Sequence, residues 1–459
     1  MAADAKQPPA LFDPHAFSTF RFLSRDLEDS GRVSLRYALD DELHFTEAID
    51  LPVPGPLGEA ERARVDGLLA LLHWVAGVSY YKLAVPAGVS LESGEPAPAQ
   101  AALLEALYSE GLGEFAYTNG LAGPPRPRFA SRNGLTAPHT PPASTADLQR
   151  VLVPVGGGKD SAVALEIVRR AGMEMALFSV GDAPPIARTV AAAGAPWLLA
   201  RRTLDPSIGE LNRAGALNGH VPITAIVSCI ALLAAALNGF DAVAMANERS
   251  ASSGNLSWAG IEVNHQFSKG LAAERALARA VAEIPDSPRL FSVLRPASEL
   301  AIARAFAGME RYHQAFTSCN AIFRIDPALR AASWCCDCPK CRFVFLALAP
   351  FCSPEHLREI FGADLLEDEA QLEGFALLTA TGGHKPFECV GEEQESIAAL
   401  RLLASDPRWR DHAVVRRLAD EVLSGLPPGE GDPEAVLALS DEHDVPAELM
   451  GYVHAVLGA

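Results

Sequence analysis

Three consecutive glycines followed by a lysine, an aspartate and a serine stand between two runs of different periodicity. They occupy residues 156–161, after the β-branched run 151–155 and at the start of a run with helical periodicity, 161–170. Glycines permit positive φ values and let a backbone wrap closely around a phosphate. The helix that follows would offer free N–H groups and a partial positive charge to an anion. The sequence therefore predicts a phosphate site at this turn.

Two familiar phosphate motifs do not fit the spacing of this turn. A Walker A loop needs a glycine where Val153 stands and a serine or threonine directly after Lys159, where the chain has Asp160. A dinucleotide-binding fingerprint needs a third glycine at the position of Ser161. A turn that only joins a strand to a helix would leave the Lys-Asp-Ser run without a purpose.

The turn resembles the Ser-Gly-Gly-x-Asp-Ser signature of the PP-loop ATP pyrophosphatases, with Val155 in place of the first serine. Members of that family cleave ATP between its α and β phosphates and activate their substrates as adenylates. The resemblance implies that Asp160 holds Mg²⁺ and that Lys159 neutralises developing charge. It also implies an adenosine site at the next strand end, because ligands bind at the carboxyl ends of parallel strands. The implied ATP-binding residues are Gly156, Gly157, Gly158, Lys159, Asp160, Ser161 and Ser179.

Five of the eight cysteines lie in one short segment of the chain. Four of them have metal-ligand spacing, namely Cys319, Cys335, Cys338 and Cys341. Four thiolates complete a tetrahedral Zn²⁺ shell, which predicts a structural zinc site with Cys336 as a spare. Such clustering without a secretion signal indicates a metal site in a reducing compartment, so we expect a cytoplasmic protein. Queuosine-precursor synthases, which are PP-loop enzymes, have a similar zinc site, whereas some tRNA-thiolating relatives hold an iron–sulfur cluster. The sequence therefore leaves a zinc ion and an iron–sulfur cluster as the two alternatives for this site.

Three loops are dense in hydrogen-bond donors, cations and carboxylates. They span residues 247–250, 264–270 and 382–392. Each loop alone could be a solvated surface segment, but three in one α/β chain favour a polar, anionic substrate. The turn 154–161, the three loops, the motif 316–320 and the cysteine motif 334–341 together resemble the UDP-N-acetylmuramoyl-L-alanyl-L-glutamate epimerase (MurL) family over roughly residues 15–400.

That resemblance implies an activity in peptidoglycan precursor synthesis. The family inverts the terminal L-Glu of UDP-MurNAc-L-Ala-L-Glu to D-Glu and converts ATP to AMP and pyrophosphate, with Mg²⁺. The substrate would be bound by Asn247, Glu248, Arg249, Asn264, His265 and Lys269.

The chemistry of such an inversion needs an activated carboxyl group. A proton beside a carboxylate is barely acidic, whereas an acyl adenylate offers a carbonyl that delocalises a carbanion; an oxazolone route is a second option. Acid/base groups must then act at the α carbon. The candidate catalytic residues are Lys159, Lys269, His384, Lys385 and Cys389. Cys389 is favoured because thiols serve other amino-acid epimerases.

These residues need a scaffold, and the chain pattern predicts one with several parts. Residues 1–120 read as an N-terminal α+β module with strands at 33–37 and 43–45 and a helix at about 59–75. That module either recognises the UDP-sugar or is structural, and its candidate ligand residues are Arg21, Arg36, Tyr80, Tyr81 and Lys82. Residues 121–147 form a Pro/Gly-rich linker.

The catalytic domain is expected at 148–352, before a mostly helical region at 353–459 with a polar loop at 381–395. Expected strands and helices alternate through the domain, at 151–155, 161–170, 175–180, 222–238 and 242–246. Alternation of this kind predicts an α/β fold with a doubly wound parallel sheet, of PP-loop (HUP-like) type by resemblance.

Composition narrows the classes of partner. The formal charge is −19 and no basic stripe with interleaved aromatics is present, so we expect no nucleic-acid partner. The most apolar run, 221–237, is shorter than the ~20 residues that span a bilayer, so we expect no membrane insertion. The remaining alternatives are a PP-loop adenylating ligase, an amidating or tRNA-modifying enzyme, and a non-enzymic sensor. The sequence does not give the oligomeric state.

Overall fold

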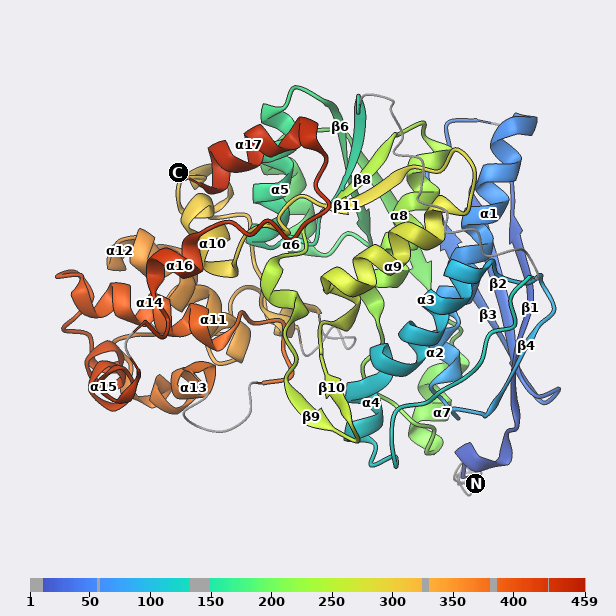
Figure 1. Cartoon of the computed structure of the whole chain (residues 1–459), viewed down its shortest axis with the longest axis horizontal. Helices are drawn as coiled ribbons and strands as arrows, with labels where there is room; N and C mark the ends of the chain where they lie inside the picture. Colours follow the sequence, from blue (N-terminus) through green and yellow to red (C-terminus); the bar gives the residue numbers. More distant parts are fainter. Residues whose placement is uncertain are drawn as a thin grey trace, which may run out of the picture.

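A single sheet runs through the protein and carries both the N-terminal strands and the strands that follow the phosphate turn. The structure is a computed structural model that describes residues 11–55, 58–132, 148–323, 330–379, 386–427 and 429–458. In these residues the sheet has nine strands in the order β11-β8-β5-β6-β7-β3-β2-β1-β4 (Figure 1). The fold is therefore mixed α/β around one large sheet.

Five parallel strands make the half of the sheet that carries the phosphate turn. They are β5 (Arg150–Pro154), β6 (Glu174–Val180), β7 (Trp197–Thr203), β8 (Ala242–Met245) and β11 (Arg289–Ser292). Their near-continuous apolar runs are typical of strands that are buried on both faces. The strands expected at 151–155, 175–180 and 242–246 are confirmed.

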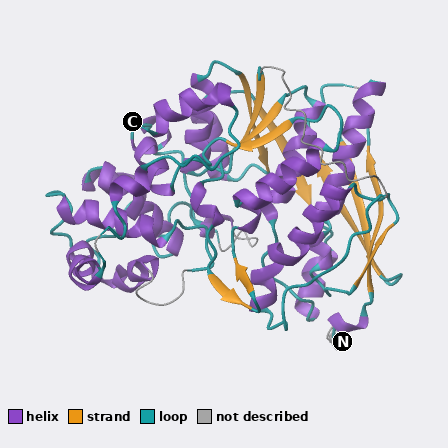
Figure 2. Cartoon of the chain, viewed as in Figure 1, coloured by secondary structure: helices purple, strands orange, loops and turns teal. Residues whose placement is uncertain are grey.

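Helices cover both faces of the parallel strands, as Figure 2 shows. One face of β5, with Val151 and Val153, packs in the same core as α5, whereas Leu152 on the other face packs with α8. The first group contains α5 (Lys159–Arg170), α6 (Pro184–Ala193), α10 (Glu299–Ala307) and α11 (Pro339–Leu348). The second contains α1 (Glu59–Ala76), α3 (Pro98–Ser109), α8 (Ile223–Leu237) and α9 (Leu271–Ala282). The sheet therefore lies between two hydrophobic cores, one on each face.

The N-terminal strands form the other half of the same sheet. They are β1 (Thr19–Leu27), β2 (Arg32–Leu39), β3 (Leu43–Asp50) and β4 (Gly88–Leu91), and β1, β2 and β3 run antiparallel. Strand β3 pairs antiparallel with β7, so the segment predicted as a separate module shares its sheet with the catalytic strands. The domain boundaries stay predictions; of the linker, residues 121–132 are irregular and 133–147 lie outside the described residues.

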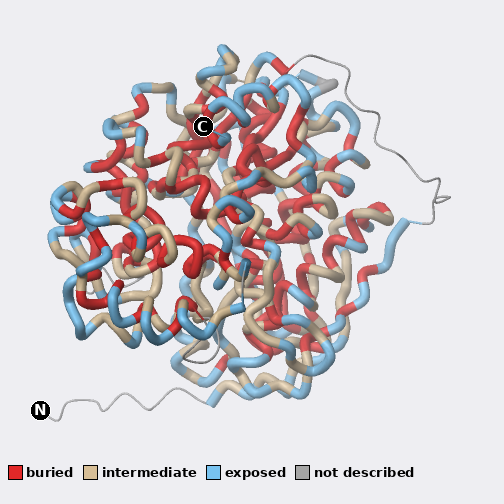
Figure 3. The backbone as a smooth tube through the Cα atoms, turned by 60° about the vertical axis from the view of Figure 1, so that its left-hand side comes forward, coloured by how far each residue is buried: buried red, intermediate tan, exposed pale blue. Residues whose placement is uncertain are grey.

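Smaller elements complete the fold. They are α2 (Val78–Tyr81), α4 (Gly113–Thr118), α7 (Ser207–Ala214) and the hairpin of β9 (Leu256–Trp258) and β10 (Ile261–Val263). The C-terminal helices are α12 (Pro354–Phe361), α13 (Leu372–Ala376), α14 (Glu393–Ser405), α15 (Ala413–Glu421), α16 (Pro433–Leu437) and α17 (Ala447–Leu457). They pack into the α5 core, and Figure 3 shows buried backbone continuing into them. Across the described segments, no helix is long and apolar enough to cross a membrane.

A buried ion pair links β3 and β7, the two strands at which the halves of the sheet meet. Arg202 of β7 donates to both carboxylate oxygens of Glu47 on β3, at 2.7 and 3.0 Å, and also to Ser79. The Glu47 side chain is 0% exposed and that of Arg202 is 10% exposed. A bidentate arginine satisfies both oxygens of a buried carboxylate, which offsets the cost of removing it from water.

We expect Arg202→Ala to destabilise the protein by about 3–5 kcal/mol, because it leaves the Glu47 carboxylate buried without a partner. Denaturant unfolding measures the effect. The neighbouring Arg201 pairs with Asp182 at the surface, where both side chains are about half exposed. Arg201→Ala is the matched control and should leave the free energy of unfolding nearly unchanged, because an exposed ion pair contributes little. Equal losses in the two variants would contradict the role given to the buried pair.

Candidate active site

A cavity of about 310 Å³ opens where the chain leaves the carboxyl ends of β5, β6 and β8 and where α8 begins. Its size is at the lower end of the range of ligand pockets. The described residues that line it include Gly156, Gly158, Asp160, Ser161 and Ser179 of the predicted ATP set. The structure thus brings the phosphate turn and the next strand end together, as the sequence predicts.

The turn itself has the geometry that a wrapped anion needs. Gly157 has a φ of +83°, and a Cβ there would meet Cβ of Pro185 at 2.7 Å, so only glycine fits. Gly158 is the N-cap residue of α5, which directs the free N–H groups of the helix start toward the turn. The Ser161 hydroxyl donates to the carbonyl of Gly158 at 3.1 Å.

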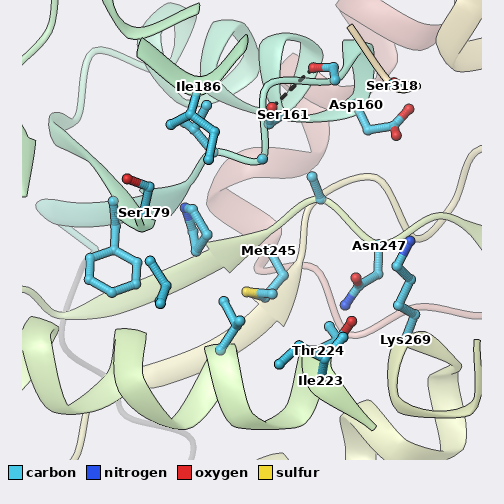
Figure 4. A pocket seen from close by; sticks show the side chains of 18 of the residues that line it. Asp160, Ser161, Ser179, Ile186, Ile223, Thr224, Met245, Asn247, Lys269 and Ser318 are labelled. Atoms are coloured by element: carbon cyan, nitrogen blue, oxygen red, sulfur yellow. Dashed lines mark hydrogen bonds between the residues drawn. The ribbon is translucent and has the colours of Figure 1, made fainter. Parts of the chain in front are cut away.

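The cavity is apolar at one end and polar at the other. Figure 4 shows Ile186 and Ser179 on one side and Asp160 and Lys269 on the other. The apolar side chains of the lining are those of Phe178, Val180, Ile186, Ile223, Val227 and Met245, of which Ile223 lies on the side of Lys269 in Figure 4. The polar end is lined by Asp160, Ser161, Asn247, Lys269, Thr317, Ser318 and Lys340. This separation suits a ligand that has a flat apolar ring at one end and anionic groups at the other.

Lys159 does not line this cavity. Its ammonium is buried and contacts Asp160 at 2.5 Å, and it also pairs with Glu299 of α10. Burial acts to lower the pKa of Lys159, but the two carboxylates outweigh it and keep the ammonium charged. Lys269 and Lys340 are the lysines that reach the cavity from the described residues. The catalytic role predicted for Lys159 stays a prediction. Lys159 is connected to the cavity only through Asp160, which it contacts and which lines the cavity.

The other predicted site residues lie at different depths. Asn247 lines the cavity, and Glu248 beside it is buried. Arg249 instead donates to the carbonyls of Ala438 and Val436, away from the cavity. The Asn264 side chain caps its own turn by accepting from the Gln266 N–H. His384 and Lys385 lie outside the described residues.

The N-terminal residues proposed for UDP-sugar binding lie in the core or in ion pairs. Tyr80 and Tyr81 are no more than 1% exposed. Arg21 pairs with Asp41 and Glu92, and Arg36 pairs with Asp26. Lys82 donates to the side chain of Asn218 and the carbonyl of Gly219. Their functional assignment stays a prediction, and the tyrosine pair packs as a structural module would.

The four predicted cysteine ligands converge. Their sulfur atoms all lie within 4.8 Å of one another, and Cys341 is 3.7 Å from Cys335 and 3.5 Å from Cys338. A tetrahedral zinc with bonds of about 2.3 Å places its sulfurs about 3.8 Å apart, which these distances approach. Cys338 also caps α11 by accepting the Cys341 N–H, so the helix start stabilises a thiolate. The residues fit a structural zinc ion.

We expect the purified protein to contain one zinc ion per chain and to lose it in Cys338→Ser, with a loss of several kcal/mol of folding free energy. Metal analysis and denaturant unfolding measure the two effects. Cys336→Ser is the control, because Cys336 is not in the cluster and contacts the carbonyl of Phe361. Purified protein that is brown and contains iron would instead indicate an iron–sulfur cluster at these cysteines.

Nearby cationic side chains lower the pKa of the Cys389 thiol. Burial acts to raise the pKa of this thiol, but the charge of Lys269 and a hydrogen bond with His265 outweigh it and lower the pKa to about 6. Lys340 contributes in the same direction. Lys269 and Lys340 also line the cavity, whereas Cys389 is not among the described residues that line it.

Two residues at this site were not predicted. Glu114 of α4 contacts Nδ1 of His265 at 2.5 Å, and the rings of His220 and His265 lie 4.4 Å apart. Glu114 sits in the first turn of a short helix, where an acidic residue also favours the helix dipole. His220 precedes α8 in a loop. Neither pattern separates these residues from ordinary helix-start and loop residues.

Comparison with known proteins gives the family of the chain. Residues 11–293 match the MurL N-terminal domain family and residues 315–429 match the MurL C-terminal domain family. The chain is 49% identical to the UDP-N-acetyl-alpha-D-muramoyl-L-alanyl-L-glutamate epimerase of a Micromonospora species, over 88% of this chain and 90% of that protein. It is 43% identical to the epimerase of the same name from Xanthomonas oryzae pv. oryzae, over 97% and 99% of the two chains. The chain belongs to the MurL family of epimerases, which are isomerases.

Proposed function

We propose that this enzyme uses ATP and Mg²⁺ to invert the terminal L-Glu of UDP-MurNAc-L-Ala-L-Glu to D-Glu in peptidoglycan precursor synthesis. The glutamyl carboxylate is first converted to an acyl adenylate, and AMP and pyrophosphate are released. The observation that carries the proposal is that the glycine turn and Lys269 line one cavity, while the charge of Lys269 also lowers the pKa of Cys389. The proposal includes a PP-loop (HUP-like) class for the parallel strands. It also includes a cytoplasmic location, since free thiolates need a reducing compartment.

In this proposal the two ends of the cavity bind different parts of ATP. The apolar end, with Phe178 and Met245, receives the adenine ring, and the turn at Gly156 and Gly158 receives the phosphates through its N–H groups. Asp160 is the one carboxylate among the described residues that line the cavity, so it would hold Mg²⁺. When bound, the ion would neutralise phosphate charge as pyrophosphate leaves.

Removal of the α proton follows adenylation. Cys389, as a thiolate, takes the proton; the C–H bond breaks, an S–H bond forms, and the electron pair moves onto the activated carbonyl. The ammonium of Lys269 returns a proton to the opposite face of the α carbon. Hydrolysis of the adenylate then releases the D-glutamyl product and AMP.

The test is one incubation with ATP, Mg²⁺ and UDP-MurNAc-L-Ala-L-Glu in D₂O. We expect D-Glu, AMP and one deuterium at the glutamyl α carbon, and Cys389→Ala should keep ATP–pyrophosphate exchange but lose deuterium entry. A ligase would form an amide or a sulfur-containing product without inversion. If neither D-Glu nor α-deuterium appears, the epimerase proposal fails.

A further inference from the structure

Three segments far apart in the sequence meet around His265. Glu114 comes from α4 in the N-terminal part of the chain, His265 follows β10, and Cys389 precedes α14. The Nδ1 atom of His265 lies 2.5 Å from a carboxylate oxygen of Glu114, and both side chains are no more than 15% exposed. The loop that carries Cys389 packs against the same region, because Gln266 Nε2 donates to the Val390 carbonyl at 3.5 Å and the rings of Tyr117 and Phe387 lie 5.9 Å apart. His265 and Cys389 shift each other's pKa.

We propose that Glu114, His265 and Cys389 form a triad in which Cys389 touches the substrate and the other two are positioning residues. This triad rests on the proposed function and deepens it, because it says how the base is aimed and kept ionised. Its consequence is that α-deprotonation depends on a residue from the N-terminal part of the chain.

The geometry explains what each member does. Glu114 accepts the Nδ1 hydrogen of His265, which fixes the orientation of the ring. In the triad, Nε2 is the ring nitrogen that serves the thiol. The carboxylate also stabilises the imidazolium, and the imidazolium stabilises the thiolate. A nucleophile or base held by a histidine that a carboxylate orients is a recurrent arrangement at sites of proton transfer.

The charges around the triad favour an ion pair. Burial acts to lower the pKa of His265, but the Cys389 thiolate and Glu114 outweigh it and raise the pKa to about 9. Lys269 and Lys340 face Cys389 from the cavity side. His220 faces the other side of His265, and burial lowers its pKa to about 4, so it stays neutral. Lys82 lies beyond His220 and acts on it in the same direction.

The proton balance follows from these charges. The thiolate accepts the proton from the α carbon, and the resulting thiol gives it to water because the imidazolium and Lys269 favour the thiolate. Lys269, having delivered its proton to the opposite face, recovers one from water. The His265 imidazolium keeps its protons throughout, the Glu114 carboxylate only accepts its hydrogen bond, and no group other than the substrate changes permanently.

A metal ion is the competing interpretation of the same residues. The ligand atoms of Glu114, His220 and His265 lie within 4.8 Å of one another. Two ligands of a tetrahedral zinc, each at about 2.0–2.1 Å, lie about 3.3 Å apart. The 2.5 Å contact between Glu114 and His265 is shorter than that separation and lies closer to the about 2.7–2.9 Å of a charge-assisted N–H···O bond. The geometry therefore favours the triad.

The experiment compares Glu114→Gln and His265→Gln with wild type in the full-length zinc-bound protein. The rate of Cys389 alkylation by iodoacetamide, followed against pH by peptide mass spectrometry, gives the thiol pKa without ATP or substrate. We expect a wild-type midpoint near 6, a rise of about one unit in Glu114→Gln and about two in His265→Gln. Deuterium entry should fall about 10-fold in Glu114→Gln and about 100-fold in His265→Gln.

Glu110→Gln is the matched control, because Glu110 is an exposed carboxylate just before α4. It should change neither the alkylation profile nor deuterium entry. An unchanged profile in both Glu114→Gln and His265→Gln, with thermal midpoints close to wild type, overturns the triad. Two zinc ions per wild-type chain, one of them lost in Glu114→Gln, would replace the triad with a metal site. Failure of the wild type to take up deuterium would instead overturn the proposed function.

Discussion

Replacing Asp160 with asparagine is expected to slow the formation of AMP by about a thousandfold, a barrier increase of about 4 kcal/mol. Asp160 is the one carboxylate among the described residues lining the cavity, so no neighbour there can replace its charge. An amide keeps the shape of the side chain but binds a hard divalent cation far more weakly than a carboxylate does. The loss should appear in adenylation itself and therefore in every later step.

The measurement is the release of AMP and pyrophosphate at saturating ATP and Mg²⁺. Asp182→Asn is the control, because Asp182 follows β6 at the same sheet edge but pairs with Arg201 at the surface and does not line the cavity. It should change the rate less than about threefold. Asp160 also contacts Lys159, but Glu299 still pairs with that buried lysine, so we expect the fold to persist. Normal AMP formation by Asp160→Asn would remove Asp160 from the catalytic machinery.

Lys269→Met should slow deuterium entry at pH 7 at least about a hundredfold, because it raises the pKa of Cys389 and also removes the ammonium that returns a proton to the α carbon. The sign follows from the charge: the ammonium stabilises the thiolate and helps to hold its pKa at about 6, so removal shifts it toward the ordinary value of about 9. Stabilisation of the thiolate is present above the folded-state pKa and is lost as the pH falls through it. The acid limb of the rate profile should therefore move to higher pH in the variant.

The pH dependence of deuterium entry separates this effect from a general loss of structure. Lys340→Met is the matched comparison, because Lys340 also lines the cavity and acts on Cys389, but less strongly than Lys269. It should move the acid limb in the same direction by a smaller amount. Raising the pH should recover part of the rate in both variants. A profile in Lys269→Met that keeps its wild-type acid limb would contradict the electrostatic role.

Contiguous motifs could be predicted from the sequence because their residues are adjacent or regularly spaced. The glycines at 156–158 and Asp160 follow one another along the chain, so the strand, turn and helix around them bring them to one cavity. Cys319 lies apart from the other three cysteines, yet its residue type alone connected it to them. Strand and helix expectations were confirmed for the same reason, since period and apolar runs are local properties.

Features that depend on long-range contacts could not be predicted. Glu114 reaches His265 across 151 residues of sequence, and nothing near either residue records the pairing. Glu299 looks like an ordinary first-turn residue of α10 until folding places it against Lys159. Arg249 occupies the expected loop, but the carbonyls of the C-terminal segment hold its side chain elsewhere. The sequence therefore shows which loop carries a charged residue but not where its side chain points.

The pairing of β3 with β7 has a practical consequence for dividing this protein into parts. A fragment that starts after residue 121 would leave β7 as an uncovered sheet edge, with open N–H and C=O groups ready to pair with another chain. The same cut would leave Arg202 without Glu47, facing the solvent along that edge. Such a fragment should self-associate, and the N-terminal piece, added separately, should compete for the edge and keep it monomeric.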